Sequence, residues 1–321
     1  MTVSREDLAA ALDELAASVV RPEHGLTGPG SWSWRIDRES VLFLGGGRAA
    51  LLQLAHPFVA HAVDQHSATR SDPLGRFQRT FDNVYAMVFG ELGQALRSAR
   101  RVHAIHTRIH GTIDEDVGAF RRGDRYDAND EGGLLWVHAT LIDSALLVYE
   151  SVFGPLRPVE REAYYQETKR FALLFGLRDR HVPRDSRAFD DYMRDMLASD
   201  TIAVGRPARE LGEFLFQAPS RAAQPPLRWL KSMTAGLMPE RLRAPFGLRF
   251  ESAERRVFRA SMASLRRVYP RIPERLRVVP AYSHALRRVS GRGDTDPIAR
   301  FVEARLPVLA SVAGFTRRAE R

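Results

Sequence analysis

The chain has 321 residues, of which 44% are hydrophobic, and it carries a formal net charge of +9 and no cysteine. This length can bury a large core in one domain or two, and the missing cysteine excludes disulfides, zinc–thiolate sites and iron–sulfur clusters. Only two of the 48 basic residues are lysine, and the arginines are interleaved with acids, so we expect no nucleic-acid partner.

The chain is predicted to be helical almost throughout. Ser4 is a suitable N-cap for a first helix, with Asp7 at the position of a capping-box acid. Residues 22–36 hold turn-forming residues and are expected to form an irregular arm, and the apolar stretch 41–63 is interrupted by three glycines and kinked at Pro57. Helices are then expected over 72–89, 91–110, 131–153 and 158–177, with a loop over 111–130 and shorter helices separated by prolines after 183.

These elements predict an all-α fold with three parts. An N-terminal helix and arm cover residues 1–37, a helical domain covers 38–240, and a helical extension over 241–321 packs on that domain. The extension is rich in arginine, and it forms either a solvated face or a surface that touches an anionic membrane. The sequence has no apolar run of 18 residues, and its N-terminus lacks the basic region and apolar segment of a signal peptide. We therefore expect a cytoplasmic protein without a transmembrane helix or signal peptide.

Seven of the ten histidines fall between His56 and His138, on segments predicted to be helical. Neutral imidazole is the commonest protein ligand for iron and other transition metals. At 100° per residue, Ile105 and His106 lie on the apolar face of helix 91–110, and His103 lies at its edge. His138 lies at the centre of the buried face of helix 131–153. A single buried histidine is most often a core residue that donates to a carbonyl, but two on separate helices predict a pocket.

A third helix, 72–89, contributes polar groups next to its apolar face. Arg76 and Thr80 border that face, and Arg79 lies further round. The sequence lacks the Glu-x-x-His pairs of di-iron bundles and the His-Glu-x-x-His zinc motif, whereas a facial triad of two histidines and a carboxylate stays open. Haem fits better, because it needs one buried axial histidine such as His106, a large apolar slot and arginines for its propionates.

The glycine triplet before Arg48 has no strand–turn–helix unit around it and matches no nucleotide-binding fingerprint. We interpret these glycines as positions that allow close packing against a helix or a cofactor.

Five segments taken together resemble the family of rubber oxygenase and ER-bound mpaB-type oxygenase catalytic domains. They cover roughly residues 40–180, and their order and spacing also agree with the family: GGGRAALLQLAHPFVAHAVDQHS (45–67), DPLGRFQRTFDNVYAMVFG (72–90), ARRVHAIHTRIHGT (99–112), RYDANDEGGLLWVHATLIDSAL (125–146) and YYQETKRFALLFG (164–176).

The resemblance implies a globin-like all-helical domain that holds b-type haem and uses O₂. The latex-clearing proteins of this family cleave carbon–carbon double bonds of polyisoprene oxidatively, and their proximal ligand corresponds to His106. Arg76 and Thr80 match residues of the family, whereas the family's lysine is replaced by Arg79, which cannot lose its proton and ligate iron. His103 also replaces an arginine. These departures point away from rubber cleavage. Because the rubber enzymes are secreted and no export signal is expected here, the resemblance favours a hydrophobic, unsaturated small molecule inside the cell.

We therefore predict a haem b-dependent oxygenase with His106 as the axial iron ligand. The remaining predicted site residues are catalytic (Arg76, Thr80 and His138) or cofactor-binding (His103, Arg79, His66 and Arg48). Two alternatives stay open: a non-catalytic haem-binding carrier or sensor, and a helical enzyme with a non-haem metal in which histidines act as acids and bases. The sequence does not determine the oligomeric state.

Overall fold

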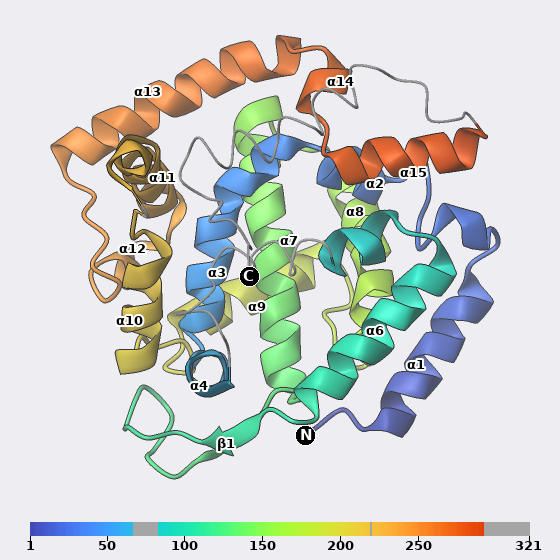
Figure 1. The fold of residues 1–321 in the computed structure, drawn as a ribbon, viewed down its shortest axis with the longest axis horizontal. Coiled ribbons are helices and arrows are strands. Elements are labelled where there is room, and N and C mark those ends of the chain that lie inside the picture. Colours follow the sequence, from blue (N-terminus) through green and yellow to red (C-terminus); the bar gives the residue numbers. More distant parts are fainter. Residues whose placement is uncertain (67–82, 219, 292–321) are drawn as a thin grey trace, which may run out of the picture.

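The computed structural model describes residues 1–66, 83–218 and 220–291, and these residues are mostly helical (Figure 1). The all-α prediction is confirmed, with one small β-hairpin in addition. The elements in chain order are α1 (Arg5–Ser18), η1 (Pro22–His24), α2 (Trp32–Asp37), η2 (Ser40–Gly45), α3 (Gly46–Leu54), α4 (Pro57–His66), α6 (Leu92–His106), β1 (His110–Thr112), β2 (Arg125–Asp127), α7 (Glu131–Phe153), α8 (Pro158–Leu173), α9 (Ser186–Ala198), α10 (Arg206–Leu215), η4 (Arg221–Ala223), α11 (Gln224–Leu237), α12 (Glu240–Arg243), α13 (Ser252–Val268), η5 (Tyr269–Arg271), α14 (Glu274–Arg277) and α15 (Pro280–Ser290).

Helix α7 runs through the centre of the molecule, with α3 and α10–α12 on one side and α1, α6 and α15 on the other (Figure 1). Its predicted bounds are confirmed. The Asp130 side chain caps its first turn by accepting from the Gly133 amide, and Gly154 ends it with a φ of 95°. By length and composition α7 could cross a membrane, but 61% of its most apolar window is buried inside the fold, which is typical of a core helix.

The glycine triplet lets two helices approach closely. A Cβ at Gly45 would lie 3.1 Å from the Ser144 carbonyl oxygen of α7, and a Cβ at Gly47 would overlap the Thr234 hydroxyl of α11. The interpretation of close packing against a helix is confirmed. The following apolar stretch is broken rather than kinked, because α3 ends at Leu54 and Pro57 begins the new helix α4.

The N-terminal region agrees with the prediction in one helix and differs in the next. The Ser4–Asp7 capping box is present at the start of α1. The prediction of an irregular arm over 22–36 is wrong for its last third, where α2 forms. The carboxylate of Glu167 in α8 accepts hydrogen bonds from the Trp32 and Ser33 amides, so the first turn of α2 is stabilised by a residue far away in the sequence.

Helix 91–110 ends earlier than expected, at His106, and a hairpin occupies part of the predicted loop 111–130. Strands β1 and β2 pair in antiparallel fashion, with Gly111 opposite Tyr126. Of the predicted helix 72–89, residues 83–89 are helical, and residues 72–82 lie outside the described part.

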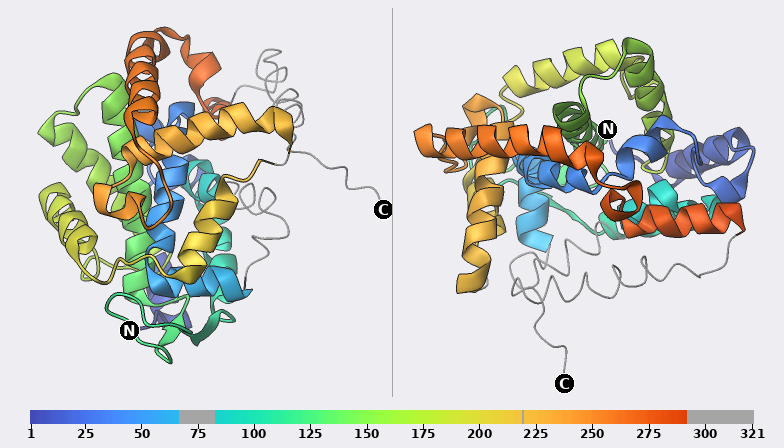
Figure 2. Two further views of the ribbon diagram at one scale, coloured as in Figure 1. Left: turned by 90° about the vertical axis from the view of Figure 1, so that its left-hand side faces the viewer. Right: turned by 90° about the horizontal axis from the view of Figure 1, so that it is seen from above.

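The C-terminal helices pack back onto the rest of the molecule. Helix α13 lies across the outside of α11 (Figure 2) and also contacts α7. Further on, the Val279 amide donates to the Arg38 carbonyl at 2.8 Å. The Glu39 carboxylate, only 2% exposed, lies 3.4 Å from Nε of Arg38 and 3.4 Å from Nη1 of Arg277. These contacts join α14 and α15 to α2, while the predicted boundaries at 37 and 240 stay predictions.

Candidate functional site

His138 is the most deeply buried of the predicted site histidines on α6 and α7. Its relative exposure is 5%, which confirms its predicted place at the centre of the buried face of α7. The ring stacks on Phe171 of α8, with centroids 5.9 Å apart and planes 16° from parallel. Burial lowers the pKa of His138 to about 4, so the imidazole is neutral at pH 7.

The Nδ1 atom of His138 is buried and has no hydrogen-bond partner within residues 1–66, 83–218 and 220–291. A buried polar atom in a native protein normally has a partner, and those that lack one among the protein atoms are candidates for a ligand contact. Phe171 belongs to a buried apolar cluster, called here the α6–α8 interior, whose side chains come from four helices: Leu8 and Leu12 of α1, Leu92, Ala95, Ala99 and Val102 of α6, Leu134 and Leu135 of α7, and Phe171 and Ala172 of α8.

Helix α6 carries His103 and His106 in its last turn, and both side chains are half-buried. Nδ1 of His106 is buried. Nε2 of His103 lies 3.1 Å from the Val3 carbonyl oxygen and donates to it, so this imidazole fixes the N-terminal segment against α6. The predicted apolar face is wrong at Ile105, which is 53% exposed, because α6 ends one residue later and its last turn lies at the surface.

Arg48, predicted to bind the cofactor, is 5% exposed and joins three helices. Its guanidinium donates to the Leu237 carbonyl oxygen at 2.9 Å and to the Ser144 hydroxyl at 2.8 Å. It also forms an ion pair with Asp143 at 2.6 Å. These contacts account for the buried charge, and a contact of Arg48 with a cofactor stays a prediction.

His66, also predicted to be near the cofactor, lies beside the β-hairpin. Its Nε2 is 3.1 Å from both the His110 carbonyl oxygen and the Tyr126 hydroxyl. The Tyr126 hydroxyl in turn donates to Gln65 at 2.6 Å. His66 is thus exposed at the end of α4, and its contact with a cofactor stays a prediction. Three further predicted residues, Arg76, Arg79 and Thr80, lie outside the described residues.

Asp37 is an ionisable group that the sequence patterns did not reveal. It accepts a hydrogen bond from the Tyr164 hydroxyl at 3.0 Å. Burial raises the pKa of Asp37 to about 7 against the lowering effect of this hydrogen bond, and the nearby charge of Glu167 raises it further. Burial and the Asp37 charge also raise the pKa of Tyr85. An isolated acid in a predicted arm gives no periodic signal that could have identified it.

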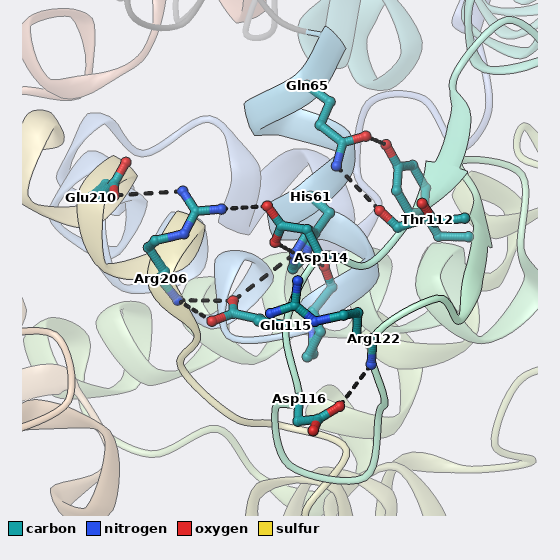
Figure 3. Close-up of polar contacts among 11 residues, drawn as sticks. His61, Gln65, Thr112, Asp114, Glu115, Asp116, Arg122, Arg206 and Glu210 are labelled. Carbon is teal, nitrogen blue, oxygen red and sulfur yellow. Dashed lines mark hydrogen bonds and ion pairs between the residues drawn. The ribbon is translucent and has the colours of Figure 1, made fainter.

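The sequence analysis also missed a second group of polar side chains. This group joins α4 to the loop between β1 and β2 (Figure 3). His61, 1% exposed, donates from Nδ1 to the Pro57 carbonyl oxygen at 2.9 Å. Its Nε2 lies 2.9 Å from Oδ1 of Asp114 and 3.9 Å from Oε1 of Glu115. The hydrogen bond to His61 lowers the pKa of Asp114, and the charge of Arg206 lowers it further. Because 53 residues separate His61 from Asp114, spacing in the sequence could not reveal this group.

The described residues thus form a helical fold that buries the imidazoles of His56 and His138, and burial lowers the pKa of each to about 4. Residues 32–267 match the family described as "ER-bound oxygenase mpaB/B'/Rubber oxygenase, catalytic domain". This match spans well over half of the chain, and the protein belongs to that family, as the sequence motifs predicted. This family is that of an oxygenase catalytic domain, which supports oxygenase activity and implies O₂ and a substrate.

The curated relatives include uncharacterized protein Mb2261 of Mycobacterium bovis and uncharacterized protein Rv2237 of Mycobacterium tuberculosis. Each is 27% identical over 234 residues, which amounts to 70% of this chain and 88% of the relative. No solved structure is significantly similar to the chain.

Proposed function

We propose that the protein is a haem b-dependent oxygenase that oxidises or cleaves a hydrophobic, unsaturated small molecule. The observation that carries the proposal is the buried, neutral His138 beside Phe171, in a chain that belongs to an oxygenase family. A globin-like haem-binding arrangement of the helices is part of the same proposal.

The donor set present fits haem. A haem iron takes a neutral imidazole nitrogen as its axial ligand, and the macrocycle needs apolar walls. His106 supplies that imidazole in our proposal, and the buried Nδ1 of His138 supplies a polar atom for a bound molecule. Val102, Leu135 and Phe171 offer the apolar walls. Once bound, haem would supply the binding and activation of O₂.

The roles of the protein's own residues follow from their protonation and contacts. His138 stays neutral above about pH 4, so it orients a bound molecule by hydrogen bonding and does not donate a proton at pH 7. We propose that Arg76 and Thr80 would act near the haem or O₂, as the resemblance to the family implies. Arg79 cannot ligate iron because its guanidinium stays protonated. We propose that His103 and Arg48 act by fixing α6 and α3 through their contacts with Val3 and Asp143.

An absorption spectrum of the purified protein tests the cofactor. We expect a Soret band that is retained in His110→Ala and lost or strongly shifted in His106→Ala. His110 is a matched control because it is an exposed histidine four residues further along the chain. A wild-type protein without a Soret band after haem reconstitution would refute the proposal, as would a His106→Ala variant with an unchanged spectrum.

Oxygen consumption with a panel of terpenoids and unsaturated lipids separates the enzyme from its alternatives. Consumption that depends on His106 and on one substrate class is the expected result. A haem spectrum without turnover would indicate a carrier or sensor, and bound non-haem metal without haem would indicate the third alternative.

We also propose that the enzyme acts inside the cell and touches anionic membranes through its basic C-terminal region. Helix α13 has Arg266 and Arg267 in its last turn, and it exposes Val257 by 40% and Val268 by 53%. Arginines next to exposed apolar side chains suit the interface of an anionic bilayer. Co-sedimentation with anionic but not with neutral vesicles is the expected result.

A further inference from the structure

We propose that His61, Asp114 and Glu115 form a binding site for one divalent transition-metal ion of the zinc or manganese class. This site is separate from the α6–α8 interior and independent of the haem proposal. The three residues offer one imidazole nitrogen and two carboxylate oxygens, all within 4.8 Å of one another (Figure 3).

The distances suit a single ion. Zinc binds histidine nitrogen and carboxylate oxygen at about 2.1 Å, so two ligands of a tetrahedral ion lie roughly 3.4 Å apart. Nε2 of His61 is 2.9 Å from Oδ1 of Asp114 and 3.9 Å from Oε1 of Glu115. These two separations lie on either side of the tetrahedral value, so a shift of about half an ångström in each carboxylate would accommodate the ion.

The tautomer of His61 points to a cation between these groups. Its Nδ1 faces the Pro57 carbonyl oxygen at 2.9 Å, and a carbonyl oxygen can only accept. Nδ1 therefore carries the proton, and a neutral His61 presents the lone pair of Nε2 to the Asp114 carboxylate and, at 3.4 Å, to the Asp114 amide. Two acceptors at 2.9 Å repel each other unless a cation or a second proton lies between them. A backbone carbonyl that fixes the other ring nitrogen is also the usual second contact of a metal-binding histidine.

Neighbouring groups hold the carboxylates without occupying the ligating atoms of Asp114. Arg206 pairs through its guanidinium with Oδ2 of Asp114, which leaves Oδ1 directed at His61. The Arg206 amide donates to both oxygens of Glu115, at 2.9 and 3.1 Å. With a neutral imidazole, two carboxylates and one guanidinium leave a net charge of −1, which attracts a divalent cation.

The site lies where an ion could enter and where it would have a structural effect. His61 is 1% exposed, whereas the Asp114 side chain is 48% exposed and the Glu115 side chain is 22% exposed. One side is therefore buried, and the other can admit water ligands. A bound ion would connect α4 to residues 114–115 and, through Arg206, to the start of α10.

Metal binding to the full-length protein tests the proposal. The protein is first depleted with a chelator and assayed for zinc, manganese and iron by mass spectrometry, and it is then titrated calorimetrically with ZnCl₂, MnCl₂ and MgCl₂. We expect one equivalent of Zn²⁺ or Mn²⁺ to bind in preference to Mg²⁺. The Kd should rise at least about tenfold in Asp114→Asn and in Glu115→Gln.

Asp116→Asn is the matched control, because Asp116 is an exposed acid of the same segment whose carboxylate accepts from the Arg122 amide. Its Kd should stay within about twofold of wild type. Thermal unfolding gives a second readout, since saturating Zn²⁺ should raise the Tm of wild type and of Asp116→Asn but not of Glu115→Gln. If the wild type shows no saturable metal binding, or if Asp114→Asn binds the metal equally well, the proposal is wrong. A proton would then lie between Nε2 of His61 and the Asp114 carboxylate. Tighter binding of Mg²⁺ than of Zn²⁺ and Mn²⁺ would overturn the proposed class of ion.

Discussion

Replacing Asp37 with asparagine measures the cost of keeping a half-buried carboxylate beside the buried Tyr164. The pKa of Asp37 rises from 3.8 to about 7 in the folded protein, chiefly through burial. Between these values the folded state binds more protons than the unfolded state, so the contribution of Asp37 to stability is fully present below about pH 4 and is lost as the pH rises through 7. One pKa unit corresponds to about 1.36 kcal/mol, so the loss reaches at most about 4 kcal/mol.

The asparagine side chain would keep an oxygen that accepts from the Tyr164 hydroxyl and would remove the charge. We therefore expect Asp37→Asn to be more stable than wild type by roughly 2–4 kcal/mol at pH 8 and by about 1–2 kcal/mol at pH 5, because the loss begins above pH 3.8. The free energy of unfolding is measured by urea denaturation at several pH values between about 5 and 8. Asp195→Asn, which removes an exposed carboxylate of α9, controls for net charge. A stability difference that stays constant across these pH values would refute the reasoning.

Two further predictions concern packing and acid stability. Gly47→Ala should lose about 1–3 kcal/mol of stability because the new methyl group overlaps the Thr234 hydroxyl. In the double variant, Thr234→Ala should restore most of this loss. If the stability changes of the two single variants simply add in the double variant, the contact is contradicted. His138 has its pKa lowered from 6.5 to about 4 by burial, so its contribution is present above pH 6.5 and is lost as the pH falls towards 4, by up to about 3 kcal/mol. His138→Met should flatten the pH dependence of stability in that window, and an unchanged slope in denaturant titrations would show that His138 does not titrate there.

The elements that were predicted correctly are those whose signals are local. Helix α7 carries its N-cap Asp130, a long apolar face and a terminating glycine within its own sequence, and its bounds were predicted without error. His138 lies inside that face, so its burial followed from periodicity.

The structure differs from the prediction where contacts between residues far apart in the sequence determine the local structure. Helix α2 depends on Glu167, 134 residues from Ser33, and the sequence around α2 shows mainly turn residues. Asp114 and Glu115 lie in a segment without periodicity, so their approach to His61 follows only from the packing of that segment against α4. Ile105 was placed on the apolar face because periodicity does not reveal where a helix leaves the interior.

The ion pairs of Glu39 set a lower limit on the length of a stable protein. The region that matches the oxygenase family ends at residue 267, whereas one of the two cations beside this carboxylate is Arg277. Burial already raises the pKa of Glu39, and these two arginines lower it. A chain trimmed to the homologous region would keep the acid and lose a counter-ion, at a cost of about 3–5 kcal/mol if the acid stays buried. For expression and crystallisation, the boundary should therefore be drawn beyond the last turn of α15 rather than at the end of the family match.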